Sequence, residues 1–141
     1  MPQDPEQPAP QTSVTIERPL EWMDTDAAGI WHYSAAIRFA EHAEMALHRQ
    51  LGIIGRTFGS MPRAHVEFDF VRPVRFGDVV RTTVSVAAVG RSSVTYELEL
   101  AGEAGTFATG RIVTVLIDPD GDVVPLPDHL RAVLTGVGGH Q

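Results

Sequence analysis

Most of the side chains that could do chemistry gather in one stretch of the sequence, from Asp24 to Tyr33. It holds two carboxylates, Asp24 and Asp26, one glycine and three ring side chains, and a helical pattern begins directly after it. The unpaired N–H groups and positive dipole of a helix start can hold the oxyanion that develops on a carbonyl, while an upstream carboxylate faces the same carbonyl. Two carboxylates before a helix are also common as capping or turn residues, so the stretch alone leaves both interpretations open.

The other titratable candidates are isolated in the sequence. His65 stands at the start of an expected strand, where a lone histidine is either a pocket residue or hydrogen-bonded structure. We expect the remaining histidines to be solvated: His42, His48, His129 and His140. No pair of histidines and carboxylates has a metal-ligand spacing, and no serine-hydrolase or phosphate-loop motif occurs, so we expect no metal site.

Length and composition indicate one domain without a membrane span. The chain has 141 residues, 43% of them hydrophobic, which suits a single core. We expect a disordered N-terminal tail over residues 1–13, one domain over 14–135 and a flexible C-terminus over 136–141. No apolar run is long enough to cross a bilayer and the first residues lack a signal-peptide core, which predicts a cytoplasmic protein. The absence of cysteine excludes disulfides and a thiol nucleophile.

The charge pattern excludes some partners. The formal net charge is −7, and the eleven basic residues form no cluster along the chain. Nucleic acid and membrane surfaces are therefore not expected as partners. One or two arginines can still hold the phosphates of a small molecule whatever the net charge.

The hydrophobic pattern predicts an α+β domain. A strand over residues 14–22 precedes one long helix over 34–51, for which Ser34 is the expected cap. Four strands follow, over residues 63–74, 78–89, 92–100 and 106–118, and a short helix ends the chain near 125–136. Short turns make the sheet antiparallel, with the long helix packed against it. Because one helix covers a sheet incompletely, we expect a homo-oligomer, by default a homodimer.

The segment WMDTDAAGIWHYSAAIRFAEHAEMALHRQLGI resembles the 4-hydroxybenzoyl-CoA thioesterase-like branch of the hotdog superfamily. The shared features are D-x-D-x-x-G, an aromatic or histidine pair and the helix that follows. The segment FVRPVRFGDVV resembles the family's turn between its second and third strands. The resemblance covers residues 14–125. It implies a hotdog fold, in which a sheet of about five antiparallel strands wraps a long central helix.

The resemblance also implies an activity, the hydrolysis of acyl-CoA or acyl-carrier-protein thioesters. Asp26 takes the place of the family's catalytic carboxylate, Tyr33 that of the residue whose N–H binds the oxyanion, and Asp24 is then structural. The family does not decide whether Asp26 attacks the thioester or deprotonates water. Coenzyme A belongs to the substrate, so no separate cofactor is expected.

Further candidates for substrate binding are Trp31, His32, Ser34 and His65, of which His65 lines the acyl pocket in the family arrangement. In the family, the turn that corresponds to Arg91, Ser92 and Ser93 meets the phosphates of coenzyme A, but such a sequence is equally typical of a plain polar hairpin turn. Many hydrolases of this branch carry a histidine seven residues after the catalytic aspartate, where this chain has Tyr33. That departure weakens a role for histidine in the chemistry.

Two other functions fit the same fold. A hydratase or dehydratase acting on enoyl thioesters would use Asp26 and His32 as an acid–base pair, and a non-catalytic protein would only bind acyl thioesters. The sequence also leaves open the acyl group, the choice between coenzyme A and an acyl carrier protein, and the choice between a homodimer and a homotetramer.

Overall fold

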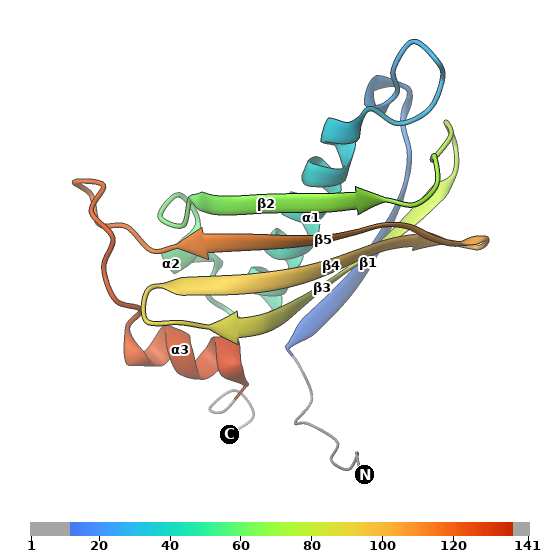
Figure 1. The fold of residues 1–141 in the computed structure, drawn as a ribbon. Coiled ribbons are helices and arrows are strands. Elements are labelled where there is room, and N and C mark those ends of the chain that lie inside the picture. Colours follow the sequence, from blue (N-terminus) through green and yellow to red (C-terminus); the bar gives the residue numbers. More distant parts are fainter. Residues whose placement is uncertain (1–11, 137–141) are drawn as a thin grey trace.

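The computed structural model describes residues 12–136, which form one antiparallel sheet with helices packed on it (Figure 1). The strands are β1 Ser13–Pro19, β2 Arg63–Phe70, β3 Val79–Val89, β4 Ser93–Gly102 and β5 Gly105–Val115. The helices are the 3₁₀ turn η1 Trp22–Asp24, α1 Tyr33–Gln50, the short α2 Ile54–Thr57, and α3 Asp128–Thr135. The predicted α+β hotdog fold, with a long helix against a five-stranded antiparallel sheet, is confirmed.

The strand order places β2 at one edge of the sheet. The order is β1-β3-β4-β5-β2, so β2 pairs with β5 alone and β1 with β3 alone. In Figure 1 the five strands follow one another in this order, with α1 behind them and α3 beneath the turn between β3 and β4. The edge position leaves one side of β2 without a partner strand within residues 12–136.

Helix α1 packs closely on the sheet because its buried side is built from small residues around one aromatic. The residues of this side are fully or nearly fully buried: Ala35, Ala36, Phe39, Ala40, Ala43 and Leu47. Alanines let the helix backbone approach the strands, and Phe39 fills the remaining space. Burial of a phenylalanine side chain of this kind contributes about 2–3 kcal/mol.

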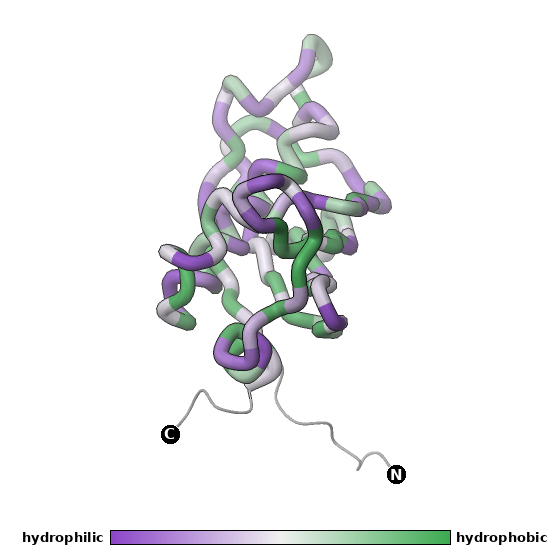
Figure 2. The backbone as a smooth tube through the Cα atoms, turned by 90° about the vertical axis from the view of Figure 1, so that its left-hand side faces the viewer, coloured by the Kyte–Doolittle hydropathy of each residue, from purple (hydrophilic) through white to green (hydrophobic). Residues whose placement is uncertain are grey.

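The strands show the alternation that the sequence predicts. On β4 the buried side chains Val94, Tyr96, Leu98 and Leu100 alternate with Thr95, Glu97 and Glu99, which lie toward the wet face. Figure 2 shows the same feature as short hydrophobic and hydrophilic segments that follow one another along the chain. One face of the sheet therefore meets the helix and the other is polar.

The expected elements are all present, but several boundaries differ. The strands expected over 63–74 and 106–118 end earlier, at Phe70 and Val115. The first strand ends at Pro19 and is followed by η1, because proline has no N–H to continue the ladder. Helix α2 was not predicted, since four residues carry too little periodicity. Strand β1 already begins at Ser13, within the expected tail, and the rest of both predicted flexible ends, residues 1–11 and 137–141, lies outside the described residues.

No helix within residues 12–136 is long and apolar enough to cross a membrane.

Candidate active site

The loop between η1 and α1 is folded into a tight turn that presents Asp26. The Asp26 N–H donates to the Ile30 carbonyl at 2.8 Å, and the Gly29 N–H donates to the Asp26 carbonyl at 3.0 Å. Gly29 has φ 80°, a left-handed conformation that glycine adopts without strain. The Trp31 N–H then donates to the Val74 carbonyl at 2.8 Å, which ties the loop to the segment before β3.

The Asp26 side chain is exposed and lines an open cavity. Its Oδ1 accepts a hydrogen bond from the Ala28 N–H at 2.8 Å, which fixes the carboxyl group within the turn. The cavity measures about 390 Å³, and its wall is completed by the last residue of β2 and the three residues after it: Phe70, Val71, Arg72 and Pro73. These wall residues were not predicted, because nothing in their sequence indicates that the end of β2 lies beside the Asp26 loop.

Tyr33 lines the same cavity and offers an unused backbone donor. It is the first residue of α1, so its N–H has no acceptor within the helix. Among residues 12–136 no hydrogen bond uses this N–H. The Tyr33 side chain is 69% exposed and stacks on the His32 ring, with 4.4 Å between centroids. The site residue Tyr33 therefore carries a free N–H at the positive end of a helix, where an acceptor is favoured.

Trp31 forms the buried floor of the site. It is 5% exposed and packs against the aromatic rings of Phe39, Phe70 and Phe107 at centroid distances of 5.8–6.4 Å. Trp31 is one of the residues that line the cavity, and its contact with an acyl group stays a prediction. The aromatic packing also holds the α1 N-terminus against the sheet.

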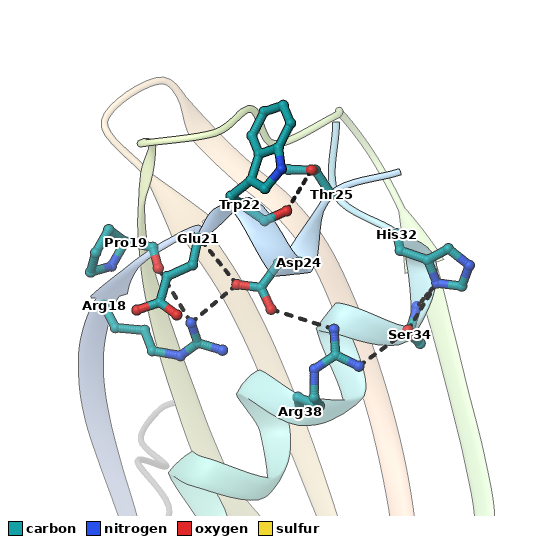
Figure 3. A network of polar contacts seen from close by, with 9 residues as sticks. All are labelled: Arg18, Pro19, Glu21, Trp22, Asp24, Thr25, His32, Ser34 and Arg38. Carbon is teal, nitrogen blue, oxygen red and sulfur yellow. Dashed lines mark hydrogen bonds and ion pairs between the residues drawn. The ribbon is translucent and has the colours of Figure 1, made fainter. Parts of the chain in front are cut away.

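Asp24 braces the loop from below (Figure 3). Its buried carboxylate accepts hydrogen bonds from the Glu21 N–H at 2.9 Å, from Arg18 at 3.2 Å and from Arg38 at 3.4 Å. Burial acts to raise the pKa of Asp24, but the Glu21 N–H and the two guanidinium groups outweigh it, so the pKa lies below the ordinary value. Asp24 is therefore held as an anion, as expected for a structural residue.

His32 and Ser34 stabilise the start of α1. His32 is the N-cap, and its Nδ1 accepts from the Ser34 N–H at 3.1 Å and lies 2.8 Å from Ser34 Oγ. The prediction that Ser34 caps the helix is therefore wrong, because a histidine ring can fill the same role from the preceding position. Arg38 donates to Ser34 Oγ at 3.3 Å and thereby joins this cap to Asp24 (Figure 3). Neither His32 nor Ser34 is among the residues that line the Asp26 cavity.

The other predicted binding residues lie far from Asp26 within the chain. His65 is exposed on β2, five residues before Phe70, and contacts Glu67 Oε1 at 2.7 Å. The turn of Arg91, Ser92 and Ser93 follows β3, whose eleven residues place it on the order of 30 Å from the segment beside the Asp26 loop. The chain by itself therefore brings Asp26, Trp31 and Tyr33 together, but not His65 or the turn.

A second group of polar residues was not anticipated. His48 was expected to be solvated, and that prediction is wrong because its side chain is buried between α2 and β4, at 8% exposure. Glu44 is buried near it and pairs with Arg63 at 2.8 Å. The four-residue spacing of Glu44 and His48 is a helical one, but the partners come from distant parts of the chain.

The comparisons with known proteins define the class of this protein. The thioesterase-like superfamily matches residues 20–134, so the chain belongs to this family. This confirms the expected resemblance and the assignment to the thioesterases.

Within the described part of the chain, no three carboxylates or histidines are placed to hold a metal ion.

One sequence relative and two solved structures of similar fold illustrate the similarity. The chain is 27% identical over 123 residues to a 1,4-dihydroxy-2-naphthoyl-CoA hydrolase of Synechococcus elongatus, covering 82% of this chain and 90% of the relative. A gentisyl-coenzyme A thioesterase has a similar structure, with TM-score 0.75, 24% identity and coverage of 84% and 99%. So does an aspartate-to-asparagine variant of 4-hydroxybenzoyl-CoA thioesterase bound to 4-hydroxybenzoyl-CoA, with TM-score 0.77, 17% identity and coverage of 87% and 99%.

Proposed function

We propose that this protein hydrolyses acyl-CoA thioesters, with the Asp26 carboxylate and the Tyr33 N–H as the catalytic groups. The observation that carries the proposal is that one cavity is lined both by Asp26, whose side chain is exposed, and by Tyr33, whose N–H is free at a helix start. The relatives named as CoA hydrolases and thioesterases support the same chemistry.

The Tyr33 N–H and the Asp26 carboxylate would have different roles in the reaction. The thioester carbonyl oxygen would accept from the Tyr33 N–H, where the helix dipole favours the negative charge that develops. Asp26 would either attack the carbonyl carbon, expelling the thiolate and leaving a mixed anhydride that water cleaves, or remove a proton from the attacking water. Both routes yield a free acid and free coenzyme A, and neither uses a further cofactor.

The acyl group we propose is an aromatic one. The rings of Trp31 and Phe70 lie at the cavity wall, where they can pack against a second ring. The three proteins described above all carry names of hydroxylated aromatic acyl thioesters. An acyl-carrier-protein thioester presents the same linkage, and it is the alternative form of the substrate.

A panel of thioesters tests this function. Release of thiol, followed with a thiol reagent, should be fastest with aromatic acyl-CoA esters and should follow the loss of the thioester. Loss of an enoyl chromophore without thiol release would instead identify a hydratase. The geometry disfavours that alternative, because His32 Nδ1 is engaged at the helix cap and His32 does not share the Asp26 cavity. Tight binding without turnover would identify a non-catalytic binding protein.

We further propose that the protein acts as a homodimer or homotetramer, and that Arg91 reaches coenzyme A across the interface. Strand β2 is an edge strand, one side of which has no partner strand within residues 12–136, and it carries exposed apolar side chains, Val66 and Phe70 among them. Antiparallel pairing of two β2 strands would turn the partner's β3–β4 end toward the Asp26 end of this protomer. Light scattering that shows a monomer at micromolar concentration would contradict the assembly.

Arg91→Ala tests the coenzyme A contact. The variant should raise KM for CoA esters more than it lowers kcat, because a phosphate contact stabilises ground state and transition state alike. Short thioesters without the nucleotide should be cleaved as by the unchanged protein. Arg49→Ala, at the exposed end of α1, is the matched control. An equal loss with both kinds of substrate would remove Arg91 from the binding site.

A further inference from the structure

The free Tyr33 N–H belongs to the peptide unit that joins His32 to Tyr33. The carbonyl of this unit accepts from the Ala35 N–H at 2.8 Å, and the His32 N–H donates to the Asp24 carbonyl at 2.8 Å. The His32 carbonyl and the Tyr33 N–H lie in one rigid plane, since a peptide unit is planar. The direction of the free N–H therefore depends on how residue 32 is held.

The His32 side chain closes the first turn of α1 (Figure 3). Its Nδ1 accepts from the Ser34 N–H at 3.1 Å and lies 2.8 Å from Ser34 Oγ. Arg38 donates to Ser34 Oγ at 3.3 Å, so the Ser34 hydroxyl keeps its own proton for Nδ1. Both contacts use the lone pair of Nδ1. The arrangement therefore requires a neutral His32 ring with its proton on Nε2.

Protonation of His32 would break this arrangement. The side chain is exposed, so water can supply the proton. A protonated ring carries an N–H on both nitrogens, and Nδ1 can then no longer accept from Ser34. It also places a positive charge at the helix start, where the dipole disfavours a cation. Because the loss of a cap loosens the first helical turn, the Tyr33 N–H would lose its fixed direction.

The charged groups around the His32 ring do not replace the lost bond. Tyr33 stacks on the ring with 4.4 Å between centroids, and Arg38 lies one hydrogen-bonded hydroxyl away. Both oxygens of the buried Asp24 carboxylate are already engaged, one of them by Arg38. Asp26 Oδ1 is held within its own turn. A protonated ring thus meets another cation and no free buried carboxylate.

We propose that His32 is a positioning residue for thioester cleavage, because its neutral ring holds the peptide unit whose N–H binds the oxyanion. The proposal rests on the function assigned to Asp26 and Tyr33 and adds a condition to it, which is that His32 must be neutral for full activity. The oxyanion forms only during the reaction, so the effect falls on kcat rather than on KM.

The pH dependence of kcat tests the proposal, with the full chain and the aromatic acyl-CoA ester that it cleaves fastest. His32→Asn keeps a cap at every pH, because the asparagine oxygen accepts a hydrogen bond without titrating. The ratio of kcat in the intact protein to kcat in His32→Asn cancels the titration of Asp26, which both share. This ratio should fall by about 3–10-fold between about pH 8 and pH 5, where histidine changes charge, with KM unchanged.

Two further variants complete the comparison. His32→Ala has no cap acceptor, and its kcat should be about tenfold lower at pH 8, a loss that His32→Asn restores; removal of an oxyanion donor itself costs roughly 10²–10³-fold. His42→Asn is the matched control, since His42 is an exposed histidine of the same helix outside the cap. The kcat ratio of the intact protein to His42→Asn should stay constant with pH. Urea denaturation at the lowest pH separates loss of folding from loss of kcat.

The Ser34 amide signal reports on the cap without any substrate. In a ¹⁵N-labelled full chain this signal should shift on acidification in the intact protein and in His42→Asn, but not in His32→Asn. A shift of Ser34 together with a constant kcat ratio would show that the cap does not position the catalytic N–H, and would overturn the proposal.

Other results would overturn it as well. They are a kcat ratio that rises on acidification, an equal change in the ratio to His42→Asn, and an effect confined to KM. Failure of the proposed function is a separate result, in which the intact protein releases no thiol or Asp26→Asn releases it at the full rate. Either of these also removes the role of His32.

Discussion

The two ends of α1 place the same chemical group in opposite surroundings. At the N-terminal end the Asp26 carboxylate is exposed in an open cavity and is held only by neighbours in its own turn. Toward the C-terminal end the Glu44 carboxyl is 7% exposed and pairs with Arg63 from β2. Burial raises the pKa of Glu44 to about 7.

The difference shows how the surroundings of a carboxyl group, before the start of α1 or on its buried side, decide what the group can do. An exposed carboxylate beside free helix N–H groups is accessible to a large substrate, and its charge need not be desolvated before the substrate arrives. A buried carboxyl with a raised pKa is inaccessible to the thioester and instead couples the core to pH. We therefore propose that turnover takes place at the open end, and that the closed end makes stability sensitive to pH.

The largest effect that separates the two ends is expected in the pH dependence of stability. Glu44 has a folded pKa of about 7 against an ordinary value of 4.5, so it contributes stability below pH 4.5 that is lost as pH rises to 7. His48 has a folded pKa of about 4 against 6.5, so its contribution is lost as pH falls from 6.5 to 4. Between pH 4.5 and 6.5 the two slopes oppose each other, and the intact protein should show a nearly flat profile.

In Glu44→Gln, the pH dependence of stability that His48 contributes should become visible. Without the Glu44 proton, the free energy of unfolding should rise by up to about 3 kcal/mol between pH 4 and 6.5, owing to His48 alone. Urea titrations across this range measure it, and Asp26→Asn is the control from the open end, with an unchanged profile. A Glu44→Gln profile as flat as that of the intact protein would show that the two groups are not linked to folding in this way.

A somewhat smaller effect on stability is expected from Asp24, whose buried carboxylate holds the loop that carries Asp26. Asp24→Asn removes a buried charge that faces Arg18 and Arg38, and we expect it to cost about 2–3 kcal/mol of unfolding free energy. The value lies below that of a fully buried pair, because Arg38 is 46% exposed. Since the pKa of Asp24 is lowered, its contribution is present above about pH 4 and should disappear at lower pH.

Urea denaturation at pH 7 and pH 3 measures this contribution. Asp120→Asn, an exposed carboxylate, should change stability by less than about 0.5 kcal/mol. If Asp24→Asn were as neutral as this control, the network in Figure 3 would not stabilise the loop.

The smallest effect concerns the hydroxyl that holds His48. Tyr96→Phe leaves His48 Nε2 without its donor and should cost about 1–2 kcal/mol. Tyr33→Phe removes the hydroxyl of an exposed ring at the other end, and stability should be unaffected. Comparable losses in the two variants, measured by urea denaturation, would contradict the different burial assigned to the two ends.

The open end could be predicted from the sequence, and the closed end could not. Asp26, Trp31 and Tyr33 lie within eight residues, so a local motif and the start of a helix were enough to place them together. Glu44, Arg63, Tyr96 and Thr114 meet only because β2, β4 and β5 pair in a particular register, which no local pattern specifies. For the same reason the sequence did not show that the end of β2 and the residues after it form a wall of the Asp26 cavity. It also led to the wrong expectation that His48 is solvated.

The central claim, that turnover depends on the carboxylate at the open end, is tested most directly by kcat for acyl-CoA hydrolysis in Asp26→Asn. The variant keeps the size of the side chain and its oxygen acceptor, but it removes the nucleophile and base, so kcat should fall by about 10²–10⁴-fold while stability stays unchanged. Asp24→Asn should retain kcat in its folded fraction, and Glu44→Gln should remain within about tenfold of the intact protein. Near-full activity in Asp26→Asn, with activity abolished in folded Asp24→Asn or His32→Ala, would contradict the assignment.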